Sequence, residues 1–175
     1  MKSKKLERNV LAALFAALCF CGTYFFKIPM LHGYIHLGDC MVLLVGLLLG
    51  PLYGGLAAGI GSMLADVIAG YASYAPGTFL IKFLAAFVAG GIFRLLYTRI
   101  KSDTSRIVVT VLSGISGGIL VILGYLLYEA IVLRYGAGAI GAVPENIVQA
   151  TSGVVICTIL YPMLYKVPSV RQWAR

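Results

Sequence analysis

Charged side chains are scarce in this sequence. Only 11% of the 175 residues are charged, 61% are hydrophobic, and the whole chain holds six acidic residues. In a typical soluble domain about a quarter of all residues are charged. The composition of this chain therefore excludes a soluble globular protein. The solvent of most of the chain must be lipid, and we predict an all-α integral membrane protein.

The usual motifs of disulfide and metal sites are also missing. His32 and His36 stand four residues apart, but no HExxH motif and no evident third ligand accompany them. The four cysteines form no CxxC pair and are best interpreted as small apolar residues. They lie within or beside apolar runs, at Cys19, Cys21, Cys40 and Cys157. We therefore expect no metal and no cofactor.

A recognisable catalytic set is missing as well. The chain has no GxxxxGK[ST] loop, so it is not expected to hydrolyse ATP itself. Ser62 and Ser73 have no base at a known spacing. We predict no catalytic residues and no enzymatic activity. One alternative of this class stays open, in which His36 and Asp39 act as acid and base on a lipid-linked substrate.

What the sequence does contain is a series of long apolar runs. A helix needs about 17–25 such residues to cross a bilayer. The N-terminal run has no cleavage site typical of a signal peptide, so we expect it to stay as the first helix. Residues 1–175 are predicted to form one membrane domain, with 135–144 as a flexible connector. The predicted helices cover residues 9–26, 37–50, 52–70, 76–97, 107–133 and 146–165.

Lysine and arginine predict the orientation of this bundle. If the N-terminus is cytoplasmic, eleven of the fourteen basic residues lie at inside ends of the helices. This asymmetry is typical of cytoplasmic loops, so we predict six helices with both termini inside. The net charge of +8 is explained in this way, and a nucleic-acid partner is not expected.

Polar and aromatic residues converge on the opposite, outer side of the predicted bundle. Ionisable groups inside a membrane usually face a cavity, a partner or a substrate, and aromatic walls with a few polar groups suit a small polar ring compound. Two other interpretations stay open: the tyrosines form an interfacial belt, or Lys82 only pairs with Asp66 or Glu129. Asp39 suits a helix start. The predicted substrate-binding residues are Tyr34, His36, Tyr74, Thr78, Lys82, Tyr125, Tyr128, Glu129, Asn146 and Gln149.

Small residues recur four apart on several predicted helices, which lets helix backbones approach closely. For Gly55/Gly59 and Gly114/Gly118 we predict packing inside the bundle. The first helix carries two staggered pairs whose smooth face would suit internal packing and another protein equally. These pairs are Ala12/Ala16 and Ala13/Ala17.

Two segments resemble a known family. The run YIHLGD at 34–39, followed by LLLGPLYGGLAAGIGSMLADVIAGYASYAPGTFLIK at 47–82, is similar to the S components of energy-coupling factor (ECF) vitamin transporters. The resemblance implies a six-helix protein that captures a water-soluble vitamin or precursor at the outer face. It implies that the loop from Lys27 to His36 closes over the ligand. It also implies residence in the plasma membrane of a prokaryote.

The resemblance also implies partners and a ligand class. A transmembrane coupling subunit would dock on Ala12, Ala13, Ala16 and Ala17, and two cytoplasmic ATPases would complete the transporter. The middle segment is most similar to members linked to hydroxymethylpyrimidine or to pyridoxine-type compounds, with riboflavin next. The alternative from another class is a stand-alone, proton-coupled secondary transporter in which Asp66 and Glu129 carry protons.

Overall fold

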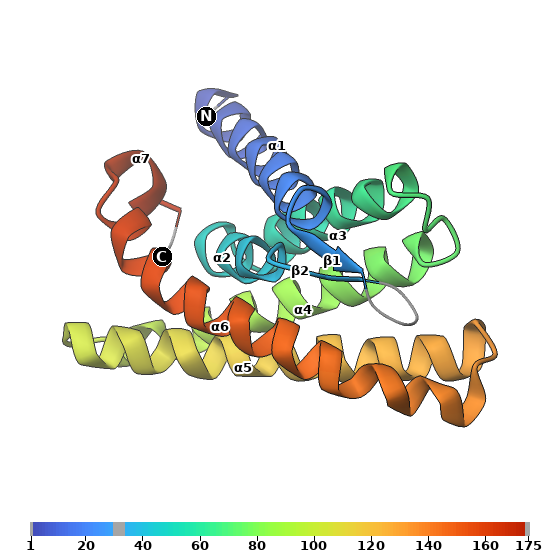
Figure 1. The fold of residues 1–175 in the computed structure, drawn as a ribbon. Coiled ribbons are helices and arrows are strands. Elements are labelled where there is room, and N and C mark those ends of the chain that lie inside the picture. The colour runs from blue at the N-terminus through green and yellow to red at the C-terminus, as the bar shows by residue number, and fades with distance from the viewer. Residues whose placement is uncertain (1, 30–33, 174–175) are drawn as a thin grey trace.

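The computed structural model describes residues 2–29 and 34–173, which form a bundle of helices with one small hairpin on top (Figure 1). The predicted six long helices are present in the predicted order, and a short helix, α7, follows them. The elements are α1 (Lys2–Tyr24), β1 (Lys27–Pro29), β2 (Tyr34–His36), α2 (Asp39–Leu49), α3 (Pro51–Ile68), α4 (Ala75–Leu96), α5 (Asp103–Leu127), α6 (Val143–Tyr165) and α7 (Pro168–Arg171).

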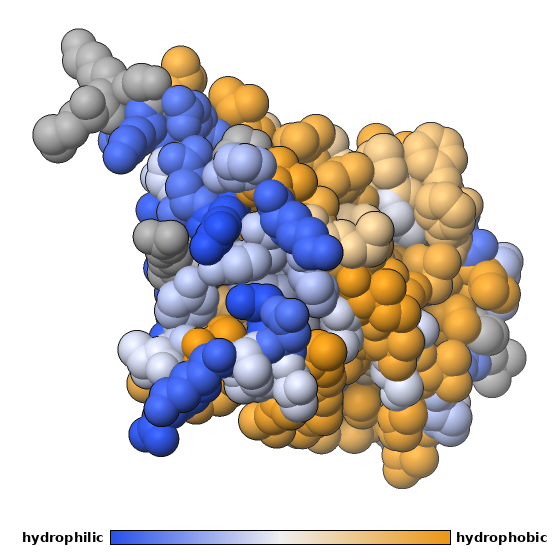
Figure 2. All heavy atoms as spheres, turned by 90° about the vertical axis from the view of Figure 1, so that its left-hand side faces the viewer, coloured by the Kyte–Doolittle hydropathy of each residue, from blue (hydrophilic) through white to orange (hydrophobic). Residues whose placement is uncertain are grey.

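Among the described residues, five helices are long and apolar enough to span a membrane, and α2 is the shorter one. Their outward faces are hydrophobic, as Leu95, Ile131 and Met163 illustrate with exposed fractions of 77%, 69% and 61%. In water such exposure would be unfavourable, but lipid is an equally apolar surrounding. Figure 2 shows hydrophilic side chains gathered on the end that carries both termini, beside a broad hydrophobic surface.

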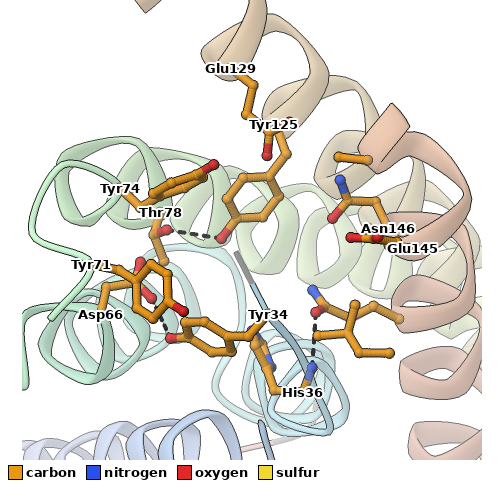
Figure 3. A pocket seen from close by; sticks show the side chains of 13 residues that line it. Tyr34, His36, Asp66, Tyr71, Tyr74, Thr78, Tyr125, Glu129, Glu145 and Asn146 are labelled. Carbon is orange, nitrogen blue, oxygen red and sulfur yellow. Dashed lines mark hydrogen bonds between the residues drawn. The ribbon is translucent and has the colours of Figure 1, made fainter. Parts of the chain in front are cut away.

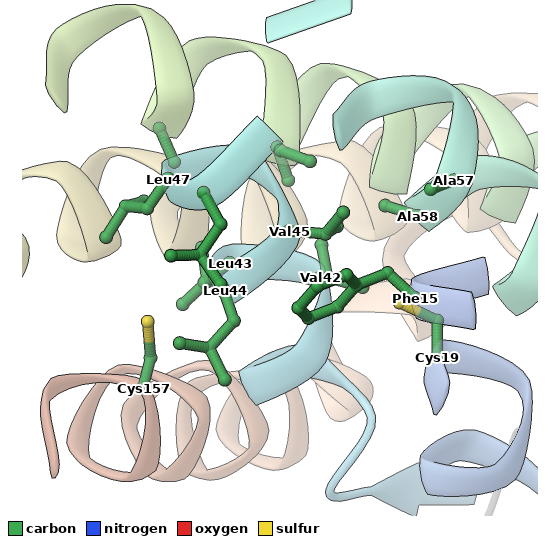
Figure 4. Close-up of a cluster of buried hydrophobic side chains, with 14 of the residues drawn as sticks. Phe15, Cys19, Val42, Leu43, Leu44, Val45, Leu47, Ala57, Ala58 and Cys157 are labelled. Atoms are coloured by element: carbon green, nitrogen blue, oxygen red, sulfur yellow. The ribbon is translucent and has the colours of Figure 1, made fainter. Parts of the chain in front are cut away.

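Helix α2 occupies the centre of the bundle and contacts α1, α3, α4 and α6. After Asp39 its side chains are apolar on every face, and Val42, Leu44 and Val45 are fully buried (Figure 4). The helix is short because the chain turns sharply directly after its last residue, Leu49. Gly50 has φ +81°, a conformation that favours glycine, and Pro51 then occupies the first turn of α3, where a missing N–H is harmless.

Small residues allow the other helices to approach one another. A Cβ atom at Gly55 or Gly59 of α3 would lie 2.9 Å from Phe83 or Phe79 of α4, and one at Gly114 of α5 would lie 3.3 Å from a valine of α6. The predicted internal packing of these glycines is therefore confirmed.

Several predicted segments differ from the structure; α5 begins at Asp103 instead of residue 107, and α6 begins at Val143 instead of residue 146. Helix α1 begins at Lys2 instead of residue 9. Hydropathy identifies only the apolar part of a helix, which fits in lipid, and α1 also includes the charged residues that precede this part. The predicted loop between the first two helices contains an antiparallel hairpin in which Lys27 pairs with His36. Residues 30–33, with His32, lie outside the described residues. The connector 135–144 is mostly a 3₁₀ helix, Gly136–Ala142.

Candidate ligand-binding cavity

A cavity lies at the end of the bundle opposite the two termini, under the β1–β2 hairpin. The space between its lining atoms is about 490 Å³, which includes the part that is open to solvent. Strand β2, the end of α3, the start of α4, the end of α5 and the start of α6 all contribute to its wall (Figure 3). The lining residues are Tyr34, Ile35, His36, Asp66, Tyr71, Tyr74, Thr78, Tyr125, Glu129, Ala142, Glu145, Asn146 and Gln149.

A hydrogen bond connects the hairpin to α3 on one side of this cavity. The hydroxyl of Tyr34 donates to Asp66 Oδ1 at 2.5 Å. The ring of Tyr34 also lies 4.9 Å from the ring of Tyr71, whose backbone N–H donates to the carbonyl of Asp66 at 2.8 Å. Burial and the Asp66 carboxylate raise the pKa of Tyr34, so its phenol stays protonated and remains a donor.

Opposite this contact, α4 and α5 meet through Thr78 and Tyr125. Their hydroxyl oxygens are 2.9 Å apart, and both residues are buried. Because Thr78 and Lys82 are four residues apart on α4, they project from the same face, and Lys82 lies one turn deeper.

Lys82 belongs to a buried polar network behind the cavity. Its Nζ lies 2.5 Å from Asp39 Oδ1, and the side chain is completely buried. Asp39 Oδ2 accepts a hydrogen bond from Gln149 Nε2 at 3.0 Å, and Gln149 Oε1 accepts one from the backbone N–H of His36 at 3.0 Å. The network thus connects α4, α2, α6 and strand β2 in one continuous chain of polar contacts.

Burial and a local hydrogen bond hold His36 in its neutral state. Its Nδ1 accepts a hydrogen bond from the backbone N–H of Gly38 at 3.1 Å, which requires that nitrogen to be unprotonated. Burial lowers the pKa of His36 from 6.5 to about 3, because desolvation outweighs the attraction of Asp39. His36 is therefore a neutral ring in the cavity wall at physiological pH.

Two of the predicted substrate-binding residues do not line the cavity. Lys82 lies behind the wall, and its partner is Asp39, so both partners suggested by the sequence, Asp66 and Glu129, were wrong. The sequence places Asp39 at a helix start, and α2 does begin there, but its carboxylate bonds across the bundle.

Tyr128 is the second residue outside the wall. Its hydroxyl donates to the carbonyl of Ser73 at 2.7 Å, and its ring lies against Gly77. The other predicted residues line the cavity, namely Tyr34, His36, Tyr74, Thr78, Tyr125, Glu129, Asn146 and Gln149. Their roles as ligand contacts stay predictions.

Five lining residues were absent from the predicted set. Asp66, Tyr71 and Glu145 stand at the same end of the predicted helices, so their polar or aromatic character was an available signal. Ile35 and Ala142 resemble any other apolar residue, and only the fold brings them to the cavity.

The acid–base alternative finds no support in this geometry. His36 Nδ1 is occupied by the Gly38 N–H, and both oxygens of Asp39 are occupied by Lys82 and Gln149. Among the described residues, no group of three histidines, cysteines or acidic residues is arranged to hold a metal ion.

A second hollow, wide and apolar, lies between α1 and α3, and we call it the α1–α3 groove. Its empty space is about 1,220 Å³, which includes open solvent, and its lining includes Ala12, Ala13, Ala16 and Ala17 together with apolar residues of α3. Ala13 and Ala17 are exposed, whereas Ala12 and Ala16 are half-buried against the bundle. One alanine pair therefore leans towards α3 while the other faces outward.

Known proteins share this sequence pattern and this fold. A family model described as "ECF-type riboflavin transporter, S component" matches residues 3–166. A Pyrococcus woesei protein, described as an uncharacterized protein in gap 3'region, is 41% identical over 129 residues, which are 74% of this chain and 80% of that protein.

Two solved structures have the same fold. The S component for biotin from an ECF-type ABC transporter is 18% identical, with a TM-score of 0.66 over 100% of this chain and 99% of the other. The S component of a bacterial ECF transporter is 22% identical, with a TM-score of 0.65 over 91% and 96%.

Proposed function

This chain belongs to the S-component family of ECF-type riboflavin transporters, and on this premise we propose that it captures a water-soluble vitamin or vitamin precursor and delivers it with an ATP-driven coupling module. The family is one of transporter components and not of enzymes. The observation that carries the proposal is the cavity itself: a polar, tyrosine-rich space at one end of an apolar bundle, covered by the β1–β2 hairpin.

The cavity end faces the outside of the cell in this proposal. The basic residues support this orientation, because they concentrate at the end that carries both termini. The hairpin then serves as the lid over the captured ligand. Tyr34 connects it to Asp66, and His36 connects it to Gln149, so the lid closes through contacts that lie in the cavity wall. The membrane is the plasma membrane of a prokaryote.

The α1–α3 groove is the docking surface for the transmembrane coupling subunit. Its alanines present a smooth apolar surface that a partner helix can approach closely. Two ATPase subunits supply the energy, since this chain has no phosphate-binding loop of its own. No cofactor is assigned to the chain.

Hydroxymethylpyrimidine or a pyridoxine-like compound is the proposed ligand, with riboflavin next. The amide of Asn146 offers a donor and an acceptor for a ring nitrogen or a hydroxyl group. The amide of Gln149 already bonds to Asp39 and His36, so it can contribute only the second N–H and the second lone pair. The tyrosines that line the opposite wall offer stacking surfaces.

Gentle purification followed by native mass spectrometry tests the capture function. The full chain should retain one vitamin-like molecule per protein, and a panel of vitamins should raise its melting temperature selectively. A folded chain that retains nothing and responds to no vitamin would contradict the proposal. Uptake that continues without any ATPase and stops when the proton gradient is removed would favour the secondary-transporter alternative.

A further inference from the structure

The charges around the cavity do not balance. Three acidic residues line it from different segments: Asp66 of α3, Glu129 of the π-helical turn Tyr128–Val132 that follows α5, and Glu145 of α6 (Figure 3). Among the described lining residues the one titratable base is His36, which is neutral because burial lowers its pKa to about 3. The wall therefore holds three acidic side chains and, among the described lining residues, no positively charged one.

Two cations lie near tyrosines of the wall, but neither faces these acidic groups as a free positive charge. Lys82 is fully buried and lies 2.5 Å from Asp39, so its charge is already balanced behind the wall. Lys27 is 4.4 Å from the ring of Tyr24 and 5.9 Å from the ring of Tyr34, and it is not among the described lining residues.

One carboxylate oxygen of Asp66 has no hydrogen-bond donor among the described residues. Its Oδ1 accepts the hydrogen bond from Tyr34, whereas Oδ2 is buried and has no hydrogen-bond partner among the described residues. The residue is only 5% exposed, so water does not compensate this oxygen freely. A buried carboxylate oxygen without a partner is unfavourable, and a donor with a positive charge is the partner that would compensate it best.

The tyrosines complete a surface that favours cations. Tyr34 and Tyr71 lie 4.9 Å apart, Tyr71 and Tyr74 lie 6.3 Å apart, and Tyr125 closes the wall beside Thr78. Burial and neighbouring carboxylates raise the pKa values of Tyr34 and Tyr74, so these rings carry protonated hydroxyls. The faces of such rings attract a positive charge.

We propose that the cavity binds its ligand as a cation: a small nitrogen heterocycle that either carries a fixed positive charge or takes up a proton when it binds. This inference rests on the proposed capture function and narrows it. An anionic ligand would meet acidic groups and no cation in the wall. A neutral ligand could donate a hydrogen bond to Asp66 Oδ2, but it would supply no positive charge. The aminopyrimidine and pyridine classes are thus favoured over riboflavin.

Calorimetry on the full chain in detergent tests the proposal with five probes. Thiamine has a fixed charge, 4-amino-5-hydroxymethyl-2-methylpyrimidine is a weak base, and the 4-oxo analogue of that pyrimidine has the same shape without the basicity. Riboflavin is neutral and biotin is an anion. We expect the two cation formers to bind at least about tenfold more tightly than the other three. The weak base should also take up a proton, so its binding enthalpy should depend on the buffer.

Two charge-neutralising variants test whether Asp66 and Glu129 attract the cationic ligand. Asp66→Asn and Glu129→Gln should each weaken thiamine binding roughly 10- to 100-fold, the range for a lost hydrogen bond to a charged group. Asp103→Asn removes the same charge from an exposed position on the first turn of α5 and should leave the affinity unchanged. The binding stoichiometry reports the folded fraction of each variant, so a partly unfolded sample does not obscure the dissociation constant.

The outcomes separate this inference from the capture function. Preferential binding of riboflavin, biotin or the 4-oxo analogue would overturn the cation inference and leave capture intact. Unchanged thiamine affinity in both variants would overturn it as well. A folded chain that binds none of the five probes would count against both proposals.

Discussion

At the scale of single residues, the pair Lys82–Asp39 places two opposite charges where neither side chain reaches solvent. Each charge is unfavourable there on its own, and the pair is stable because Gln149 also satisfies the second oxygen of Asp39. The pair lies directly behind the cavity wall, and Lys82 Nζ is 5.1 Å from the ring of Tyr125. Its role is to join α2 and α4 and to hold Gln149 in one orientation.

Breaking this pair should destabilise the protein strongly. Lys82→Ala leaves a buried carboxylate without its counter-ion, and we expect a loss of about 3–5 kcal/mol in the free energy of unfolding. The double variant Lys82→Met/Asp39→Leu removes both charges and should recover most of that loss. Denaturant unfolding in detergent measures the free energy of unfolding of the single and the double variant. Asp103→Asn, which breaks an exposed pair with Arg106, should change little. Equal losses in the single and double variants would show that the pairing is not what matters.

His36 should make the stability of the protein depend on pH. Its pKa is about 3 in the folded protein and near 6.5 when it is exposed. Between these values the unfolded chain binds a proton that the native state does not, so stability should fall as the pH decreases from about 6.5 towards 3. The melting temperatures of the unchanged protein and of His36→Asn, measured between pH 7.5 and 4.5, check this prediction. The asparagine of the variant does not titrate. Parallel pH profiles for the two proteins would contradict the prediction.

At the scale of secondary-structure elements, close glycine contacts hold α2 between α3 and α4. A Cβ atom at Gly54 of α3 would lie 2.6 Å from the Cα of Gly46. On the other side of α2, Gly46 lies against Ala86 and Gly90 of α4. The three helices therefore meet backbone to backbone, which brings Asp39 and Lys82 into range of each other.

A single methyl group should disturb this crossing. Gly46→Ala forces α2 and α4 apart, and we expect a loss of about 1–3 kcal/mol, the usual range for overpacking. The melting temperature of the purified variant measures the loss. Gly141→Ala is the matched control, because a Cβ atom there would meet nothing within 4 Å. Equal melting temperatures for the two variants would mean that the crossing can relax at no cost.

At the scale of the whole molecule, the ligand cavity and the α1–α3 groove are separate. The described residues that line the cavity include none from α1, whereas α1 forms one side of the groove and α3 forms the other. Binding of the ligand and docking of the coupling subunit should therefore be separable by mutation.

The double variant Ala13→Leu/Ala17→Leu should show this separation. Both alanines are exposed in the groove, so larger side chains should block a partner helix without reaching the cavity. We expect loss of co-purification with the coupling subunit and of uptake in cells, with unchanged ligand affinity. Leu14→Phe adds volume to an exposed position of α1 that is not among the groove residues, and it should have no effect. Normal assembly of the double variant would place the docking surface elsewhere.

The sequence by itself determined the class of protein and the order of its helices. Apolar runs, breakers such as Gly50-Pro51 and the small-residue spacings act over a few residues, so they can be read without the fold. The resemblance to S components rested on such local motifs, and the family match confirms it. The subtype linked to hydroxymethylpyrimidine stays a prediction.

Only the tertiary structure decided which polar groups meet. Lys82 and Asp39 are 43 residues apart in the chain, and Gln149 and Asp39 are 110 apart. Several carboxylates were available to Lys82, and the choice among them depends on how each helix is rotated and how deep it lies. Packing between helices sets that rotation, through contacts such as Gly46 against Gly54, and no periodicity within one helix reports it. For the same reason the sequence pointed to the end of the bundle where the cavity lies, while the fold decided that Lys82 stands behind the cavity and Asp66 stands in its wall.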